Sequence, residues 1–143
     1  MTVTFFGHSD APRSIETRLK TLLIQLIEEQ GACLFYVGNH GAFDRIVQST
    51  LALLQKTHPH IQCRIVLAYL PNHQTAASDI ATVYPEGLEV VPQRFAISKR
   101  NQWMIRHADL VITYVQHDWG NAARYKDMAK RWRKTVIELT DSF

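Results

Sequence analysis

The chain has 143 residues, of which 46 % are hydrophobic and 20 % are charged, and its formal net charge at pH 7 is +3. This is ordinary globular composition, and the length indicates a single domain that spans 1–143 and is large enough for an apolar core. Because no run of about 18 apolar residues occurs, a membrane-spanning helix is excluded. The first residues, MTVTFFGHSD, lack the basic flank and long apolar centre of a signal peptide, and we expect no membrane partner.

The cysteines Cys33 and Cys63 each begin an apolar run, and they form no CxxC pair and no metal-like spacing with the histidines. We interpret them as small buried thiols in a reducing compartment, which predicts a cytoplasmic location. His58 and His60 flank a proline in a predicted loop, where surface histidines are commoner than metal ligands. We therefore expect no metal site.

Apolar periodicity predicts strands and helices that alternate along the chain. The segment 13–31 has apolar residues at helical spacing with Gly31 as its stop, and Ser98 is a candidate cap for a later helix. From 71 to 94 the periodicity is lost, and we expect at most a short helix and a short edge strand there. The expected strands are 2–7, 33–37, 64–70, 109–115 and 135–139, and the expected helices are 13–31, 42–59, 97–108 and 119–134.

Strands separated by helical segments are typical of βαβ units. The fold class predicted is therefore α/β, a Rossmann-like three-layer sandwich with a mostly parallel sheet of about five strands. In such sheets ligands bind outside the carboxyl ends of the strands. The residues just after the strands are Gly7, His8, Ser9 and Asp10; Gly38, Asn39, His40 and Gly41; Tyr69, Pro71 and Asn72; and 116–121.

The turn Gly38-Asn39-His40-Gly41 has two interpretations. Its glycines supply the backbone freedom of a tight turn, or their lack of a Cβ lets a phosphate reach the amides at the start of the 42–57 helix. The named nucleotide and hydrolase motifs GxGxxG, GxxxxGK[ST], HExxH and GxSxG are all missing. A dinucleotide dehydrogenase or a P-loop enzyme is therefore not expected.

A basic residue and two tryptophans add to the candidate site. Arg100, near the start of a predicted helix, suits a phosphate clamp, and the alternative is an exposed arginine paired with Glu86 or Glu89. Trp103 stands at helical spacing and is interpreted as a core residue. Trp119 precedes a glycine at a strand end and is interpreted as a site aromatic.

Several segments, VTFFGHSD, LFYVGNHGAFDRIV, VLAYLP, YPEGLE, SKRNQWMIRHADLVITYV and WGNAA, occur in an order that resembles the small single-domain YpsA/YspA-like proteins of the SLOG superfamily. That superfamily also includes the DprA/Smf proteins and the LOG phosphoribohydrolases. The resemblance implies a Rossmann-like sheet that binds a nucleotide-derived ligand. The binding residues that it implies are Gly7, His8, Ser9, Gly38, Asn39, His40, Gly41, Asp44, Arg100, Asn101, Gly120 and Asn121.

The chain departs from the phosphoribohydrolase pattern at the position of the catalytic glutamate. Arg100 and Met104 match that pattern, but Ala123 or Arg124 stands where the glutamate is expected. Cleavage of an N-glycosidic bond needs a carboxylate. Catalysis by Glu86, Glu89 or Asp10 would require that 71–94 fold over the pocket.

Three functions remain open. We rank first the binding of a nucleotide or nucleotide-derived ligand, for sensing or sequestration and without catalysis, and the sequence indicates no specific cofactor besides this ligand. A nucleotide-processing N-glycosidase-like enzyme is second. A nucleic-acid-binding domain, suggested by the basic run from Arg124 to Lys134, is third. Homo-oligomers are common for small sheets, and 103–105 or the aromatic C-terminal helix offers an interface for one.

Overall fold

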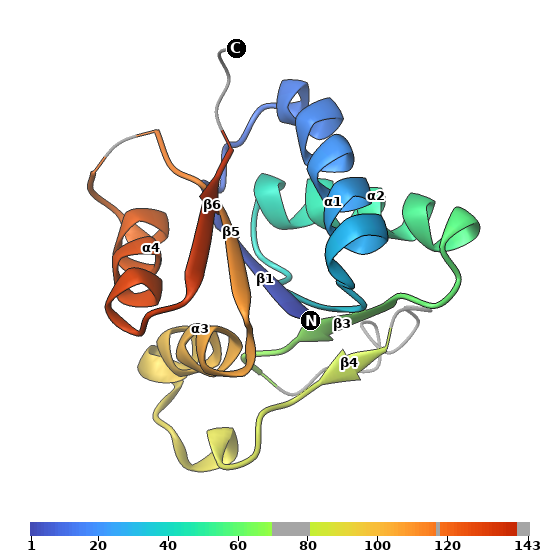
Figure 1. Cartoon of the computed structure of the whole chain (residues 1–143). Helices are drawn as coiled ribbons and strands as arrows, with labels where there is room; N and C mark the ends of the chain where they lie inside the picture. The colour runs from blue at the N-terminus through green and yellow to red at the C-terminus, as the bar shows by residue number, and fades with distance from the viewer. Residues whose placement is uncertain (70–80, 117, 140–143) are drawn as a thin grey trace.

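The computed structural model of the chain describes residues 1–69, 81–116 and 118–139 (Figure 1). These residues form one six-stranded sheet in the order β4-β3-β2-β1-β5-β6, and every described strand pair is parallel. The α/β prediction is confirmed, with one strand more than the expected five. The strands are β1 (Thr2–Gly7), β2 (Leu34–Val37), β3 (Gln62–Val66), β4 (Thr82–Val83), β5 (Leu110–Tyr114) and β6 (Thr135–Glu138).

Two pairs of helices cover the two faces of the sheet (Figure 1). One pair is α1 (Glu16–Gln30) and α2 (Ala42–Thr57), and the other is α3 (Ala96–His107) and α4 (Asn121–Arg131). Short 3-10 turns at Arg13–Ile15, Leu88–Val90 and Gln93–Phe95 precede or connect these elements. The structure therefore has the three layers that the alternating pattern predicts.

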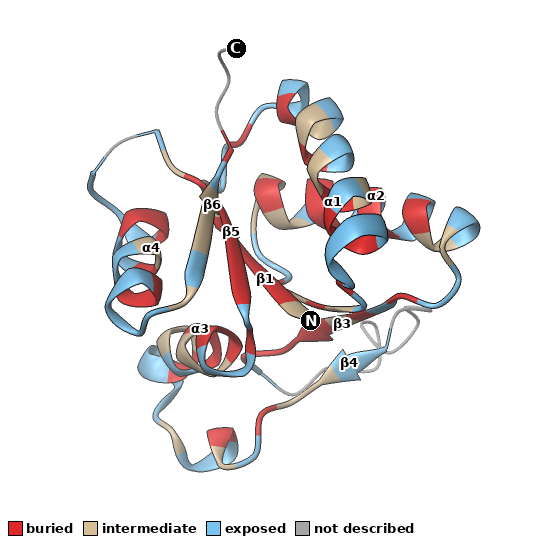
Figure 2. Cartoon of the chain, viewed as in Figure 1, coloured by how far each residue is buried: buried red, intermediate tan, exposed pale blue. Residues whose placement is uncertain are grey.

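β1 lies inside the sheet and is buried on both faces (Figure 2). Val3 and Phe5 belong to the core under α1 and α2, whereas Phe6 belongs to the core formed with α3 and α4. Side chains alternate across a strand, so this one apolar run supplies both cores. β1 is thereby fixed firmly, and the loop that follows it has a rigid base.

Two local predictions are wrong. Ser98 does not cap α3, because the turn Gln93–Phe95 leads directly into the helix and makes Phe95 the capping residue. Cys33 is exposed, unlike the buried Cys63, because it precedes β2 at the amino edge of the sheet beside Met1. The predicted end of α1 is confirmed, since Gly31 adopts a left-handed conformation with φ of 76°.

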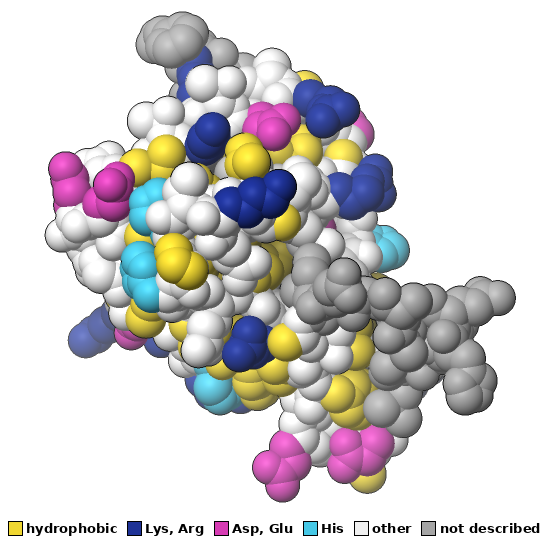
Figure 3. All heavy atoms as spheres, turned by 90° about the vertical axis from the view of Figure 1, so that its right-hand side faces the viewer, with side chains coloured by type: hydrophobic (Ala, Val, Ile, Leu, Met, Phe, Trp, Pro, Cys, Tyr) yellow, Lys and Arg dark blue, Asp and Glu magenta, His cyan; other side chains and the backbone are white. Residues whose placement is uncertain are grey.

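The surface view in Figure 3 shows acidic and basic side chains interspersed on one face of the molecule. Mixed signs of charge of this kind keep a surface hydrated without creating a strong field of one sign. Among the described residues, no helix combines the length and the apolar character that crossing a membrane requires.

Candidate functional site

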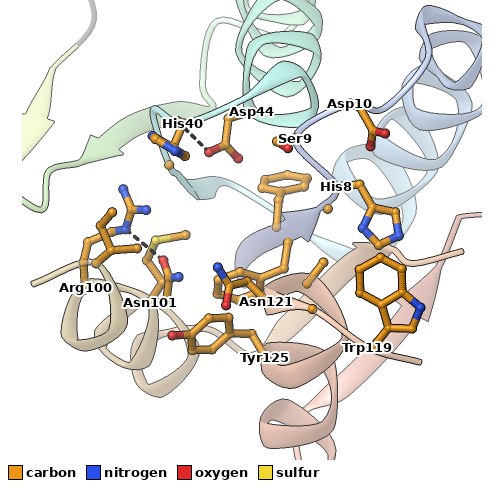
Figure 4. A pocket seen from close by; sticks show the side chains of 18 residues that line it. His8, Ser9, Asp10, His40, Asp44, Arg100, Asn101, Trp119, Asn121 and Tyr125 are labelled. Carbon is orange, nitrogen blue, oxygen red and sulfur yellow. Dashed lines mark hydrogen bonds between the residues drawn. The ribbon is translucent and has the colours of Figure 1, made fainter. Parts of the chain in front are cut away.

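A cavity of about 460 Å³ opens at the carboxyl ends of the strands (Figure 4). From β1 the chain passes outward through β2, β3 and β4 on one side, while β5 and β6 lie on the other, so the strand order reverses between β1 and β5. Ligands of doubly wound sheets bind at this crevice. The lining residues are Phe5, Phe6, Gly7, His8, Ser9, Asp10, Gly38, His40, Asp44, Ile97, Arg100, Asn101, Met104, Trp119, Gly120, Asn121, Ala122 and Tyr125.

Most of the site residues expected from the sequence line this cavity. Asn39 and Gly41 do not: the first is exposed and accepts a hydrogen bond from Arg100, and the second packs against the loop after β1. Glu86 and Glu89 are exposed and do not line it either. Tyr69 is exposed outside it, while Pro71 and Asn72 lie outside the described residues.

The sequence interpretation missed several cavity residues on helices. Ile97 and Met104 share one face of α3 with the predicted residues Arg100 and Asn101, and a search along that face at helical spacing from Arg100 would have found both. Tyr125 lies one turn after Asn121 on α4 and follows from the same rule. A rule restricted to strand ends cannot select residues one turn into a helix.

Arg100 is only 4 % exposed, so the alternative of a surface arginine paired with Glu86 or Glu89 is wrong. Its Nε donates to Asn101 Oδ1 at 2.8 Å, and its Nη1 donates to the Val66 carbonyl at 3.1 Å and to Asn39 Oδ1 at 3.2 Å. Burial lowers the pKa of the guanidinium, and Asp44 nearby opposes this shift. Within the described part of the chain, Nη2 is the guanidinium nitrogen without an acceptor.

Asp44 is the second charged group of the cavity. Its Oδ2 accepts a hydrogen bond from the His40 amide at 2.9 Å. Burial raises the pKa of this carboxyl, although the His40 hydrogen bond and the charge of Arg100 act in the other direction. A Cβ added at Gly38 would lie 2.6 Å from Asp44 Oδ2 and 3.5 Å from Arg100 Nη1, so only glycine leaves room between the two charges.

The turn at residues 38–41 packs closely against the loop that follows β1. The Ala42 amide, the first of α2, donates to the Ser9 carbonyl at 2.8 Å, and the His40 amide is bound by Asp44. A Cβ added at Gly41 would lie 2.8 Å from Ser9 Cα. Because the Ser9 carbonyl already binds the first amide of α2 and Asp44 places a carboxyl in the first turn, the start of α2 suits a phosphate less than a helix start without these groups.

The start of α4 differs from that of α2. Gly120 has φ of 94° and ψ of 178°, close to the 93° and 176° of Gly41, but the first turn of α4 contains no acidic residue. Helical bonding begins when the Arg124 amide donates to the Gly120 carbonyl at 3.1 Å, so the amides of 121–123 have no intrahelical acceptor. Gly120, Asn121 and Ala122 line the cavity, which places this positive helix end on its wall.

Aromatic rings form the remaining walls. Phe6 stacks on Tyr125 with ring centroids 5.4 Å apart, while Trp119 is 68 % exposed. His8 Nε2 accepts the Gln116 amide at 2.8 Å, so this nitrogen is unprotonated and the ring joins the loops after β1 and β5. Trp103 lies elsewhere, partly buried against Tyr36 and stacked on His107, in agreement with its core interpretation.

The basic run of α4 lies toward the opposite end of that helix from the cavity. Lys126 and Lys130 both pair with Glu138, and Lys126 lowers the pKa of that carboxyl. Lys134 Nζ donates to the Arg106 carbonyl at 3.3 Å. Part of this positive charge therefore has partners within the protein.

Among the described residues, no three His, Cys, Asp or Glu side chains gather where they could hold a metal ion. No protein-family model matches the chain, and no curated protein matches it either.

Proposed function

We propose that the protein binds a nucleotide or nucleotide-derived ligand in this cavity and does not transform it. The observation that carries the proposal is the meeting of a helix start free of acidic residues, a buried arginine and the exposed ring of Trp119 around one opening. Small-molecule sites are typically about 300–1,000 Å³ in volume, and the cavity of about 460 Å³ falls within that range.

The phosphate end of the ligand is assigned to α4. The amides of 121–123, which have no intrahelical acceptor, and the helix dipole both favour an anion, and Gly120 permits close approach because it has no Cβ. Arg100 adds a fixed positive charge on the neighbouring wall, although most of its donors are bound within the protein. It therefore acts on a phosphate through its field and Nη2, not as a two-pronged clamp.

The base end is assigned to His8 and Trp119. Figure 4 shows these rings at one end of the cavity, with Arg100 and Asn101 at the other. Stacking of a base on an aromatic side chain contributes about 1–3 kcal/mol and tolerates any base. Trp119 is 68 % exposed, so a stacked base could cover much of its ring.

A specific observation keeps the enzyme as a second candidate. Asp44 brings a carboxyl into the cavity, and Asp10 brings another to its rim, whereas Glu86 and Glu89 bring none. An N-glycosidase needs a carboxyl to stabilise the developing positive charge on the sugar or to activate water. If the ligand is cleaved, Asp44 is the residue to substitute first.

Native mass spectrometry tests the proposal and separates the two candidates. The purified protein is measured alone and after addition of AMP, ADP, ADP-ribose, NAD and cyclic nucleotides. A mass increase equal to one intact nucleotide supports binding, and a released base or sugar phosphate supports the enzyme. If no nucleotide adds mass or is cleaved, both candidates are rejected.

A further inference from the structure

We infer that Asp44 recognises the sugar of the ligand, with its second carboxylate oxygen accepting hydrogen bonds from the vicinal hydroxyls of a ribose. The cavity then selects ribose 5-phosphates over their 2-deoxy counterparts. This inference rests on the proposed function, because it assumes that a phosphorylated sugar enters the cavity.

The two oxygens of Asp44 have different surroundings. Oδ2 accepts the His40 amide at 2.9 Å, whereas Oδ1 has no donor within the described part of the chain. Asp44 lines the cavity, and Figure 4 shows its carboxyl at the cavity wall opposite Asn121 and Tyr125. A ligand donor is therefore the natural partner for Oδ1.

The carboxyl is held in place before any ligand arrives. The His40 bond fixes one oxygen, and the open space at Gly38 accommodates it. Gln48 Nε2 donates to the Gly38 carbonyl at 2.8 Å and fixes the loop from the α2 side. A group that does not need to be ordered on binding contributes more of its interaction energy to affinity.

The charges around Asp44 favour a neutral donor. A phosphate would be repelled by the carboxylate, and a ligand cation would lie close to Arg100 on the other side of Gly38. A sugar hydroxyl carries no charge and donates a hydrogen bond to a carboxylate. Each carboxylate oxygen has two lone pairs, so Oδ1 can accept hydrogen bonds from two adjacent hydroxyls while Oδ2 stays bound to the His40 amide.

The assignment also fits the positions of the two helix starts. The acid-free start of α4 attracts the phosphate, and the start of α2 carries Asp44. Both lie on the wall of the same cavity. A ligand with an anion at one end and hydroxyls at the other, as in ribose 5-phosphate, has a partner for each end.

Isothermal titration calorimetry with ribose 5-phosphate and 2-deoxyribose 5-phosphate tests the inference without a base. The wild type is compared with Asp44→Asn, which keeps an oxygen for the His40 amide, and with Asp127→Asn, the same change at an exposed residue outside the cavity. A hydrogen bond to a charged group corresponds to a preference of about tenfold or more. We expect that preference for ribose 5-phosphate in the wild type and Asp127→Asn, and less than about threefold in Asp44→Asn.

Equal affinities of the wild type for the two sugars overturn the inference, and so does a preference that survives in Asp44→Asn. If neither sugar phosphate binds while intact nucleotides do, the inference is rejected and the proposed function stands. If nucleotides also fail to bind, both are rejected. Circular dichroism of Asp44→Asn shows whether the variant is folded, and Asp44→Ser provides a second test with a smaller side chain.

Discussion

The Ser9 carbonyl accepts a hydrogen bond from the Ala42 amide at 2.8 Å, which ties the loop after β1 to the first turn of α2. Gly41 lies against the same residue, since an added Cβ would be 2.8 Å from Ser9 Cα. Two walls of the cavity are therefore joined by backbone contacts. Gly41, which allows this close contact, therefore has a structural role, and this leads to the first prediction.

Gly41→Ala should destabilise the fold more than Gly31→Ala. Both glycines have positive φ, but Gly41 combines φ of 93° with ψ of 176°, a region open almost only to glycine. A Cβ added at Gly41 would also meet backbone atoms, whereas nothing lies within 4 Å of a Cβ added at Gly31. We expect the free energy of unfolding to fall by about 2–4 kcal/mol in Gly41→Ala and by about 1 kcal/mol in Gly31→Ala. Urea denaturation measures both, and equal losses would contradict the assigned contact.

Arg100→Met should lower the free energy of unfolding by about 2–4 kcal/mol, because it leaves Asn101 and the Val66 carbonyl without their donor. Lys99→Met removes the same charge at the adjacent, exposed position and should change stability by less than about 0.5 kcal/mol. Urea denaturation of the two variants provides the comparison. A stable Arg100→Met protein would show that Arg100 is not part of the structural framework of the site.

Asp44 should make the protein less stable as pH rises from about 4. Burial raises the pKa of Asp44 in the fold above its ordinary value of 3.8. At pH values between 3.8 and this raised pKa, the native state therefore binds more protons than the unfolded chain. The free energy of unfolding contributed by Asp44 therefore falls as pH rises through this window. Asp44→Asn should flatten this part of the profile and be at least as stable as the wild type at pH 7. Thermal melts from pH 3.5 to 7 test this, and an unchanged slope would refute it.

Asn121→Asp should weaken AMP binding about tenfold or more while affecting adenosine less, because it places a carboxylate at the start of α4, where the phosphate is assigned. Thr17→Asp adds the same charge to the exposed first turn of α1, outside the cavity, and should change AMP affinity less than about twofold. Titration calorimetry with AMP and adenosine compares the variants. A parallel loss for both ligands would move the phosphate away from α4.

The two thiols should differ in reactivity at pH 8. Cys33 is exposed, whereas burial raises the pKa of Cys63 to about 11 and removes the reactive thiolate. Ellman's reagent should modify one thiol per chain in native buffer and both in denaturant. In Cys33→Ser the fast reaction should disappear. Two fast equivalents in the wild type would show that β3 opens readily.

The elements with a strong apolar period could be predicted from the sequence, whereas single contacts could not. The alternation of strands and helices follows from local patterning, and Gly31 marks a helix end because few other residues adopt its conformation. β4 has only two residues, too few for any period, and it exists because β3 offers it an edge. Cys33 begins an apolar run, yet its exposure depends on its place at the edge of the sheet.

For the candidate site, the sequence likewise predicted which loops meet, but not which of their groups are already bound by the protein. The strand-end rule brought the loops at Gly7 and Gly38 to one place, because parallel strands end on the same edge. It could not show that the amides near Gly41 are already bound by Ser9 and Asp44, since that depends on the distance between two loops. The phosphate assignment therefore moves from α2 to α4 only when both helix starts are compared in three dimensions.

The cavity takes its walls from both ends of the chain, since β1 and its loop lie on one side and α4 on another. A ligand that touches both would act as a removable cross-link between the first and last parts of the sequence. Each tenfold excess of free ligand over its Kd would raise the free energy of unfolding by about 1.4 kcal/mol. Hydrogen exchange of the amides in β1 and α4 would then slow together, although these elements are far apart in the chain.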